Sequence, residues 1–193
     1  MNRREFLGNA FLAVSAQNDE QAALVTVDRD QPLGVIAPDF MGLGHRDFIS
    51  AYSPIGDDEH GHYTAKPEYY GMLAFSLGGK GRLLKAEMDA SAPDVKAYAT
   101  QPNKGALTLT LINKRAGRAA LTVVTGNHTQ ASRAAVTRLS GPAIDAKSGI
   151  TLGGAEVTPA GTWKPMKPEV LQARNGQLEI ELPAASAAIV EIR

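Results

Sequence analysis

The sequence contains no cysteine, which excludes disulfide bonds and thiolate metal centres. Its 20 Lys and Arg residues balance 20 Asp and Glu residues. The chain therefore lacks the charge excess of a nucleic-acid-binding protein or of a polybasic membrane surface. No apolar run approaches the roughly 20 residues that a membrane-spanning helix needs. Aromatic residues make up only 6% of the chain, so the core must be built mainly from aliphatic side chains.

The chain has 193 residues, with 19 glycines and many Ala, Val, Thr and Leu residues. A chain of this length can bury roughly 70% of the surface that its unfolded form exposes, so a single domain needs no further stabilising device. Abundant glycine and β-branched residues are typical of a β protein with many turns.

The N-terminal segment "MNRREFLGNAFLAVSA" (1–16) has a basic start, a short apolar stretch and small residues at its end. Its "RREFL" resembles a twin-arginine export signal, and "VSA" fits a cleavage site. The apolar stretch is shorter than usual, and a flexible amphipathic N-terminus is the alternative. We interpret residues 1–16 as a signal-like segment and expect a secreted protein, periplasmic or extracellular.

Most of the remaining chain has the pattern of short strands separated by turns. Leu107, Leu109 and Leu111 alternate with threonines, and Leu178, Ile180 and Leu182 alternate with glutamates. Tight connections are expected at 101–105 and at "NG" (175–176). The predicted strands are 22–28, 82–88, 95–101, 106–113, 119–126, 134–141, 155–161, 177–183 and 187–193.

One helix is predicted, over residues 67–77. Pro67 suits the first helical position and Glu68 suits the positive end of the helix dipole, while Gly78 and Gly79 mark the stop. The helix is apolar nearly all round, so we expect neighbours to cover most of its sides. The predicted fold class is mainly β: an antiparallel β-sandwich of about eight to ten strands with this short packed helix, in one domain spanning 17–193.

Three segments carry a family resemblance. "QPLGVIAPDFMGLGH" (31–45) resembles the start of the catalytic barrel in glycoside hydrolase family 79, which holds β-glucuronidases and heparanase. "AYSPIGDDEHGHYTAKPEYYGMLAF" (51–75) is similar to the end of that barrel, and residues 82–193 resemble the family's C-terminal β-domain. The resemblance implies a truncated hydrolase in which 37–80 is a remnant of the (β/α)8 barrel.

The resemblance also implies what is missing. The family's two catalytic carboxylates belong to barrel strands that have no counterpart between "MGLGHRDF" and "ISAYSPI", and the chain has no Asn-Glu dipeptide. A retaining glycosidase needs both carboxylates about 5 Å apart. We therefore expect no catalytic residues. The remnant strands must pair antiparallel or form loops, because the junction is too short for a parallel crossover. The helix must pack on the sandwich or on another subunit.

The segment 51–75 holds the candidate binding residues. Tyr52 and Tyr63 could contact a glucuronide-like carbohydrate, since the resemblance places this loop beside the uronate pocket, or they could merely pack the loop. Asp57, Asp58, Glu59, His60 and His62 are residue types that bind metals, but no spacing fixes a geometry, so we read a solvated loop without metal. No cofactor is indicated.

Other features have simpler interpretations. Trp163 could be a carbohydrate platform, although an anchor at the edge of the core is favoured. Glu68 and Asp58 lie close to the tyrosines in sequence, which alone does not indicate acid–base chemistry. "GLGH" and "GGKG" are turns rather than phosphate loops.

Three functions follow. The first is a non-catalytic accessory domain with possible carbohydrate contact. The second is a hydrolase of β-glucuronides, if a partner chain supplies a barrel. The third is an interaction module that self-associates or binds a barrel-containing partner through the helix surface.

Overall fold

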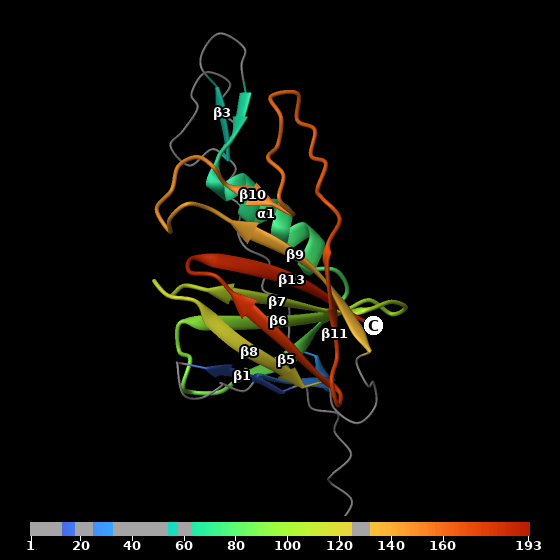
Figure 1. Cartoon of the computed structure of the whole chain (residues 1–193). Helices are drawn as coiled ribbons and strands as arrows, with labels where there is room; N and C mark the ends of the chain where they lie inside the picture. The colour runs from blue at the N-terminus through green and yellow to red at the C-terminus, as the bar shows by residue number, and fades with distance from the viewer. Residues whose placement is uncertain (1–12, 18–24, 33–53, 58–62, 125–131) are drawn as a thin grey trace, which may run out of the picture.

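The computed structural model describes residues 13–17, 25–32, 54–57, 63–124 and 132–193 (Figure 1). This part of the chain forms thirteen strands and one helix. They are β1 (Ala13–Gln17), β2 (Val25–Pro32), β3 (Ile55–Asp57), β4 (Tyr63–Ala65), α1 (Pro67–Gly78), β5 (Arg82–Met88), β6 (Val95–Gln101), β7 (Leu107–Asn113), β8 (Ala119–Val124), β9 (Arg133–Ser140), β10 (Thr151–Leu152), β11 (Glu169–Gln172), β12 (Gln177–Leu182) and β13 (Ser186–Ile192).

Two antiparallel sheets carry the fold, which confirms the predicted mainly β class. The large sheet has eight strands in the order β10-β9-β13-β7-β6-β5-β2, and β11 pairs with β9 outside this path. The small sheet has the order β1-β8-β12 and lies across one face of the large sheet (Figure 1). Strands β3 and β4 form a separate antiparallel hairpin.

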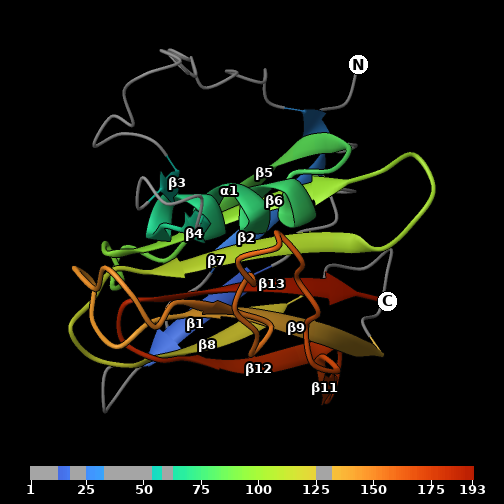
Figure 2. The same ribbon diagram turned by 90° about the horizontal axis from the view of Figure 1, so that it is seen from above.

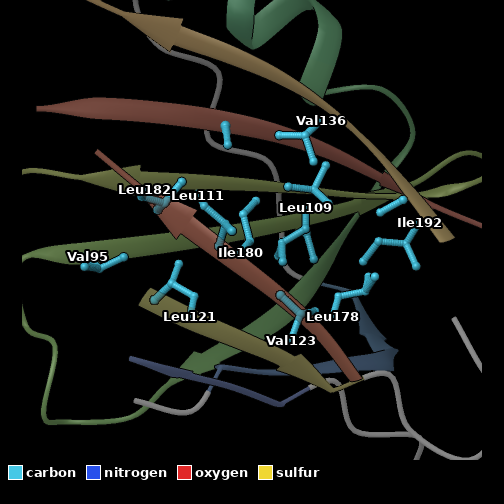
Figure 3. Packing of buried hydrophobic residues seen from close by; sticks show 14 of the residues in the cluster. Val95, Leu109, Leu111, Leu121, Val123, Val136, Leu178, Ile180, Leu182 and Ile192 are labelled. Carbon is cyan, nitrogen blue, oxygen red and sulfur yellow. The ribbon is translucent and has the colours of Figure 1, made fainter. Parts of the chain in front are cut away.

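The main core lies between the two sheets and is aliphatic. Leu109 and Leu111 of the large sheet and Leu178 and Leu182 of the small sheet are fully buried. Figure 3 shows their side chains meeting between the layers. Strand side chains alternate between faces, so the glutamates of β12 are left on the outer side. Burial of each such leucine stabilises the fold by about 2 kcal/mol.

Helix α1 covers the outer face of the large sheet, as Figure 2 shows from above. Its buried residues Tyr70 and Ala74 pack with Leu152 and Ile189 in a second apolar cluster. The helix has twelve residues, and no helix among the described residues is long and apolar enough to cross a membrane. The structure thus has three layers, and the helix packs on the sandwich as expected.

Polar contacts fix both ends of α1. The Tyr70 hydroxyl accepts a hydrogen bond from the Val157 amide at 2.9 Å, and the Gly78 carbonyl accepts one from Thr100 Oγ1 at 2.6 Å. Pro67 begins the helix, and the N–H of Gly79 donates to the carbonyl of Phe75 at 2.7 Å. The helix therefore begins where predicted and ends one residue later, at Gly78.

One predicted strand was wrong. Residues 155–161 form no strand. They belong to a loop in which Ala155 and Val157 form only isolated bridges, with Leu152 and Trp163, and the chain turns at Gly161 with a φ of 73°. The short strands β10 and β11 and the hairpin of β3 and β4 were not predicted. The described strands number thirteen rather than eight to ten, since these short pieces lack an alternating pattern long enough to detect.

Strand β1 overlaps the predicted signal-like segment 1–16. Its residues Ala13 to Gln17 pair with β8 from Val124 to Ala120. The division into 1–16 and 17–193 stays a prediction, and so does export.

Candidate functional site

The two predicted carbohydrate-binding tyrosines are only partly placed by the structure. Tyr52 lies outside the described residues. Tyr63 begins β4, opposite Asp57 of β3, and its side chain is 51% exposed. About half of Tyr63 is thus accessible to a ligand, and its role in binding stays a prediction.

The acidic-histidine loop is also largely outside the described part. Asp58, Glu59, His60 and His62 fall there, and Asp57 is described only as a paired residue of β3. Across the described ranges, no three His, Cys, Asp or Glu side chains are grouped as metal ligands. Glu68 is exposed in the first turn of α1.

Trp163 has the surroundings of a core anchor. Its indole Nε1 donates a hydrogen bond to the Leu152 carbonyl at 3.0 Å, and its ring packs against the cluster beneath α1. A tryptophan whose N–H is bound inside the fold presents little free ring face for a sugar. These contacts support the anchor interpretation.

The outer face of α1 is the first candidate surface. We define it by Met72 and Phe75, which are 38% and 62% exposed, together with Gly71, one turn before Phe75. The expectation that neighbours cover most of the helix is wrong for this side of the described structure. The large sheet can cover only the face that carries Tyr70 and Ala74, which leaves a second apolar stripe on the surface.

The second candidate is a cavity of about 400 Å³ at the edge of the sandwich. It opens where β12, the last strand of the small sheet, lies beside β9 and β11 of the large sheet. We call it the edge cavity. Its lining residues come from β8, β9, β11 and β12: Ala120, Leu121, Thr122, Arg138, Glu169, Leu171, Glu179, Ile180 and Glu181.

Arg138 organises one wall of the edge cavity. Its Nε and Nη2 contact Glu169 Oε2 at 2.9 and 2.8 Å, while Nη1 donates to the backbone carbonyl of Glu181 at 2.7 Å. The guanidinium thus joins β11 to the edge of β12. Glu181 also contacts Arg118 at 3.5 Å, an exposed pair that contributes little to stability.

The carboxylates of the edge cavity do not have the arrangement of a glycosidase pair. Glu179 and Glu181 lie two residues apart on one face of β12, so they point the same way rather than toward each other. The third, Glu169, is already bound by Arg138. Among the described residues that line this cavity, none is aromatic, so none could stack on a sugar ring.

Sequence reasoning did not find this cavity. The alternation in "QLEIELP" indicates that Glu179 and Glu181 share an outward face. Nothing in the sequence shows that Arg138, 41 positions before Glu179, lies beside them. That proximity depends on β9 and β12 belonging to different sheets that approach at one edge.

The comparisons with known proteins bear on the fold just described. Residues 97–189, which include β7, β8, β9, β12 and part of β13, match the family model described as the glycosyl hydrolase family 79 C-terminal beta domain. The resemblance to family 79 is confirmed for this β-domain. The search of curated proteins found no match.

One solved glycosidase shares the fold described above, and two others were also matched. A 4-O-α-L-rhamnosyl-β-D-glucuronidase from Fusarium oxysporum 12S is 17% identical over 67% of this chain and 30% of its own, with a TM-score of 0.57. The chain thus spans less than a third of that enzyme. A bifunctional glucanase-xylanase from a metagenome library matches at 23% identity over 65% of this chain and 22% of its own, with a TM-score of 0.45. An arabinose-bound α-L-arabinofuranosidase matches at 14% identity over 76% and 22%, with a TM-score of 0.49.

Proposed function

We propose that the chain is a non-catalytic β-sandwich accessory domain of the family 79 type, with carbohydrate contact at Tyr52 and Tyr63. The observation that carries the proposal is the match of residues 97–189 to a C-terminal β-domain rather than to a catalytic one. The exposed ring of Tyr63 supports the carbohydrate contact.

Turnover of a chromogenic β-glucuronide tests the proposal. The full chain at micromolar concentration is expected to hydrolyse no more substrate than a buffer blank over several hours. Glu169→Gln, Glu179→Gln and Glu181→Gln serve as matched variants, because these carboxylates line the edge cavity. Reproducible turnover that one of these variants abolishes would establish an enzyme and overturn the proposal.

The carbohydrate contact has a separate test. Titration of glucuronate into isotope-labelled protein is expected to shift the amide signals of Tyr63 and its strand neighbours, and Tyr63→Ala is expected to reduce those shifts. Tyr98→Ala is the control, because Tyr98 is equally exposed, at 51%, on β6. Shifts that Tyr63→Ala leaves unchanged would contradict the contact.

An interaction role is the second candidate, and the outer face of α1 favours it. Met72 and Phe75 form an exposed apolar surface on a helix whose two ends are hydrogen-bonded to the sandwich. Such surfaces commonly mark association sites. We propose that this face binds the catalytic barrel of a partner or a second copy of the chain.

Light scattering after size-exclusion chromatography tests self-association, and co-elution with a separately produced family 79 barrel tests the other partner. Phe75→Ser is expected to abolish either complex, whereas Tyr98→Ser is expected to leave it intact. A monomer that binds no barrel would contradict the interaction role.

A further inference from the structure

The edge of β12 is open along the edge cavity. In the described part of the chain, β12 pairs with β8 on one side only, and the small sheet ends there. Three hydrogen bonds establish which residues point outward. The N–H and carbonyl of Gln177 pair with Arg174, and the carbonyl of Glu181 accepts from Arg138.

Backbone groups alternate in direction along a strand, so Gln177, Glu179 and Glu181 all present their backbone groups away from β8. Arg174 already bonds both backbone groups of Gln177, and Arg138 already bonds the carbonyl of Glu181. The N–H and carbonyl of Glu179 lie between them, followed by the N–H of Glu181. This stretch spans about 7 Å, the length of two residues of an extended peptide.

The charges beside this edge determine which sign of charge a ligand should carry. The lining residues of the edge cavity carry three carboxylates and one guanidinium, and that guanidinium is bound to Glu169. Glu181 also contacts the exposed Arg118 at 3.5 Å, so three carboxylates face two guanidinium groups and the edge of β12 is left with a net negative charge. A strand with lysine or arginine at alternate positions would place its cations opposite Glu179 and Glu181.

The same charges disfavour a second copy of this chain. Antiparallel pairing of β12 with β12 would bring Glu179 and Glu181 of both copies onto one face, where like charges destabilise the pair. We propose that the β12 edge binds an extended basic segment of another protein, which adds as a strand and fills the edge cavity. Main-chain hydrogen bonds supply the binding and the glutamates supply the preference for cations.

Peptide titration tests this site. The probe is the end-blocked peptide Thr-Lys-Val-Lys-Thr, added to the full chain with nitrogen-15 label. We expect the largest amide shifts at Glu179 and Glu181. We also expect binding at least tenfold weaker for Thr-Glu-Val-Glu-Thr. The basic peptide with both lysines N-methylated on the backbone should likewise bind at least tenfold more weakly, because a residue opposite Glu179 or Glu181 in an antiparallel pair turns its N–H toward β12.

Variants of the protein complete the test. The double substitution Glu179→Lys and Glu181→Lys is expected to reverse the preference between the two peptides, and both side chains are exposed, so the fold is retained. Glu156→Lys, an exposed substitution in the loop after β10, is the matched control and should leave the preference unchanged.

Three results would overturn the proposal. They are the absence of shifts at Glu179 and Glu181 at millimolar peptide, undiminished binding of the N-methylated peptide, and a dimer that Glu179→Lys and Glu181→Lys abolish. The second would show only non-specific attraction between charges, and the third would show that the edge belongs to a second copy.

Discussion

Asn113 shows at the scale of one residue how the two sheets are joined. Its side chain is 1% exposed at the end of β7. Nδ2 donates to the carbonyls of Gly117 and Pro183 at 2.9 and 2.8 Å and to that of Leu182 at 3.3 Å, while Oδ1 accepts from the Arg115 amide at 3.0 Å. One amide thus ties the turn after β7 to the connection between β12 and β13.

Replacing Asn113 tests this role. Asn113→Ala is expected to lower the free energy of unfolding by about 2–3 kcal/mol, because several backbone groups lose buried partners. Asn113→Asp is expected to be more stable at acid pH. Carbonyl oxygens around a buried carboxyl raise its pKa in the folded state above the unfolded value of about 3.9, so stability is lost as pH rises through the folded pKa.

Urea unfolding from pH 4 to pH 8 measures this effect. The exposed loop substitution Asn103→Asp is the control and should show no comparable dependence on pH. If the difference in free energy of unfolding between Asn113→Asp and the unmodified chain did not change with pH, the assigned contacts would be contradicted.

Ala185 is a second informative residue, in the turn between β12 and β13. Its φ of 48° lies in the left-handed region, which costs a residue with a side chain about 1 kcal/mol relative to glycine. Ala185→Gly is therefore expected to raise the unfolding midpoint slightly. Ala184→Gly, one position earlier and without a positive φ, should lower it. Thermal unfolding by circular dichroism compares the two, and equal effects would contradict the turn geometry.

Helix α1 shows at the scale of an element how closely two layers approach. A Cβ at Gly78 would collide with Oγ1 of Thr110 on β7, so the helix and the sheet meet there without room for a side chain. At Gly71, on the exposed side of the same helix, a Cβ would meet nothing within 4 Å.

The two glycines predict opposite results. Gly78→Ala is expected to destabilise the protein by about 1–3 kcal/mol, because the collision outweighs the gain in helix propensity. Gly71→Ala is expected to stabilise it by up to about 1 kcal/mol. Denaturant unfolding of both variants measures this, and equal stabilisation would show that α1 does not pack on β7 as described.

Strand β1 gives a prediction about the N-terminal segment. Five of its residues pair with β8, so deleting residues 1–17 would convert β8 into a sheet edge. We expect this truncation to lower the unfolding temperature more than the removal of residues 1–12 alone. Identical unfolding temperatures for the two truncated proteins would show that β1 does not stabilise the sandwich.

At the scale of the whole molecule, the sequence was sufficient to predict the sandwich and the helix. The alternating leucines of β7 and β12 define an inner face, and Pro67 with the paired glycines defines the helix. The features that the sequence did not predict depend on contacts between residues far apart in the chain. Arg138 reaches β12 only because two sheets meet at one edge, and α1 has one covered face because a single sheet supports it.

Trapping of a covalent intermediate tests the central claim, the absence of catalysis, most directly. Retaining glycosidases form a glycosyl-enzyme intermediate on a carboxylate. An activated 2-fluoro-glucuronide, incubated with the full chain, is expected to leave the intact mass unchanged. A single added 2-fluoroglucuronyl group on one Asp or Glu, with stoichiometry approaching one, would contradict the account.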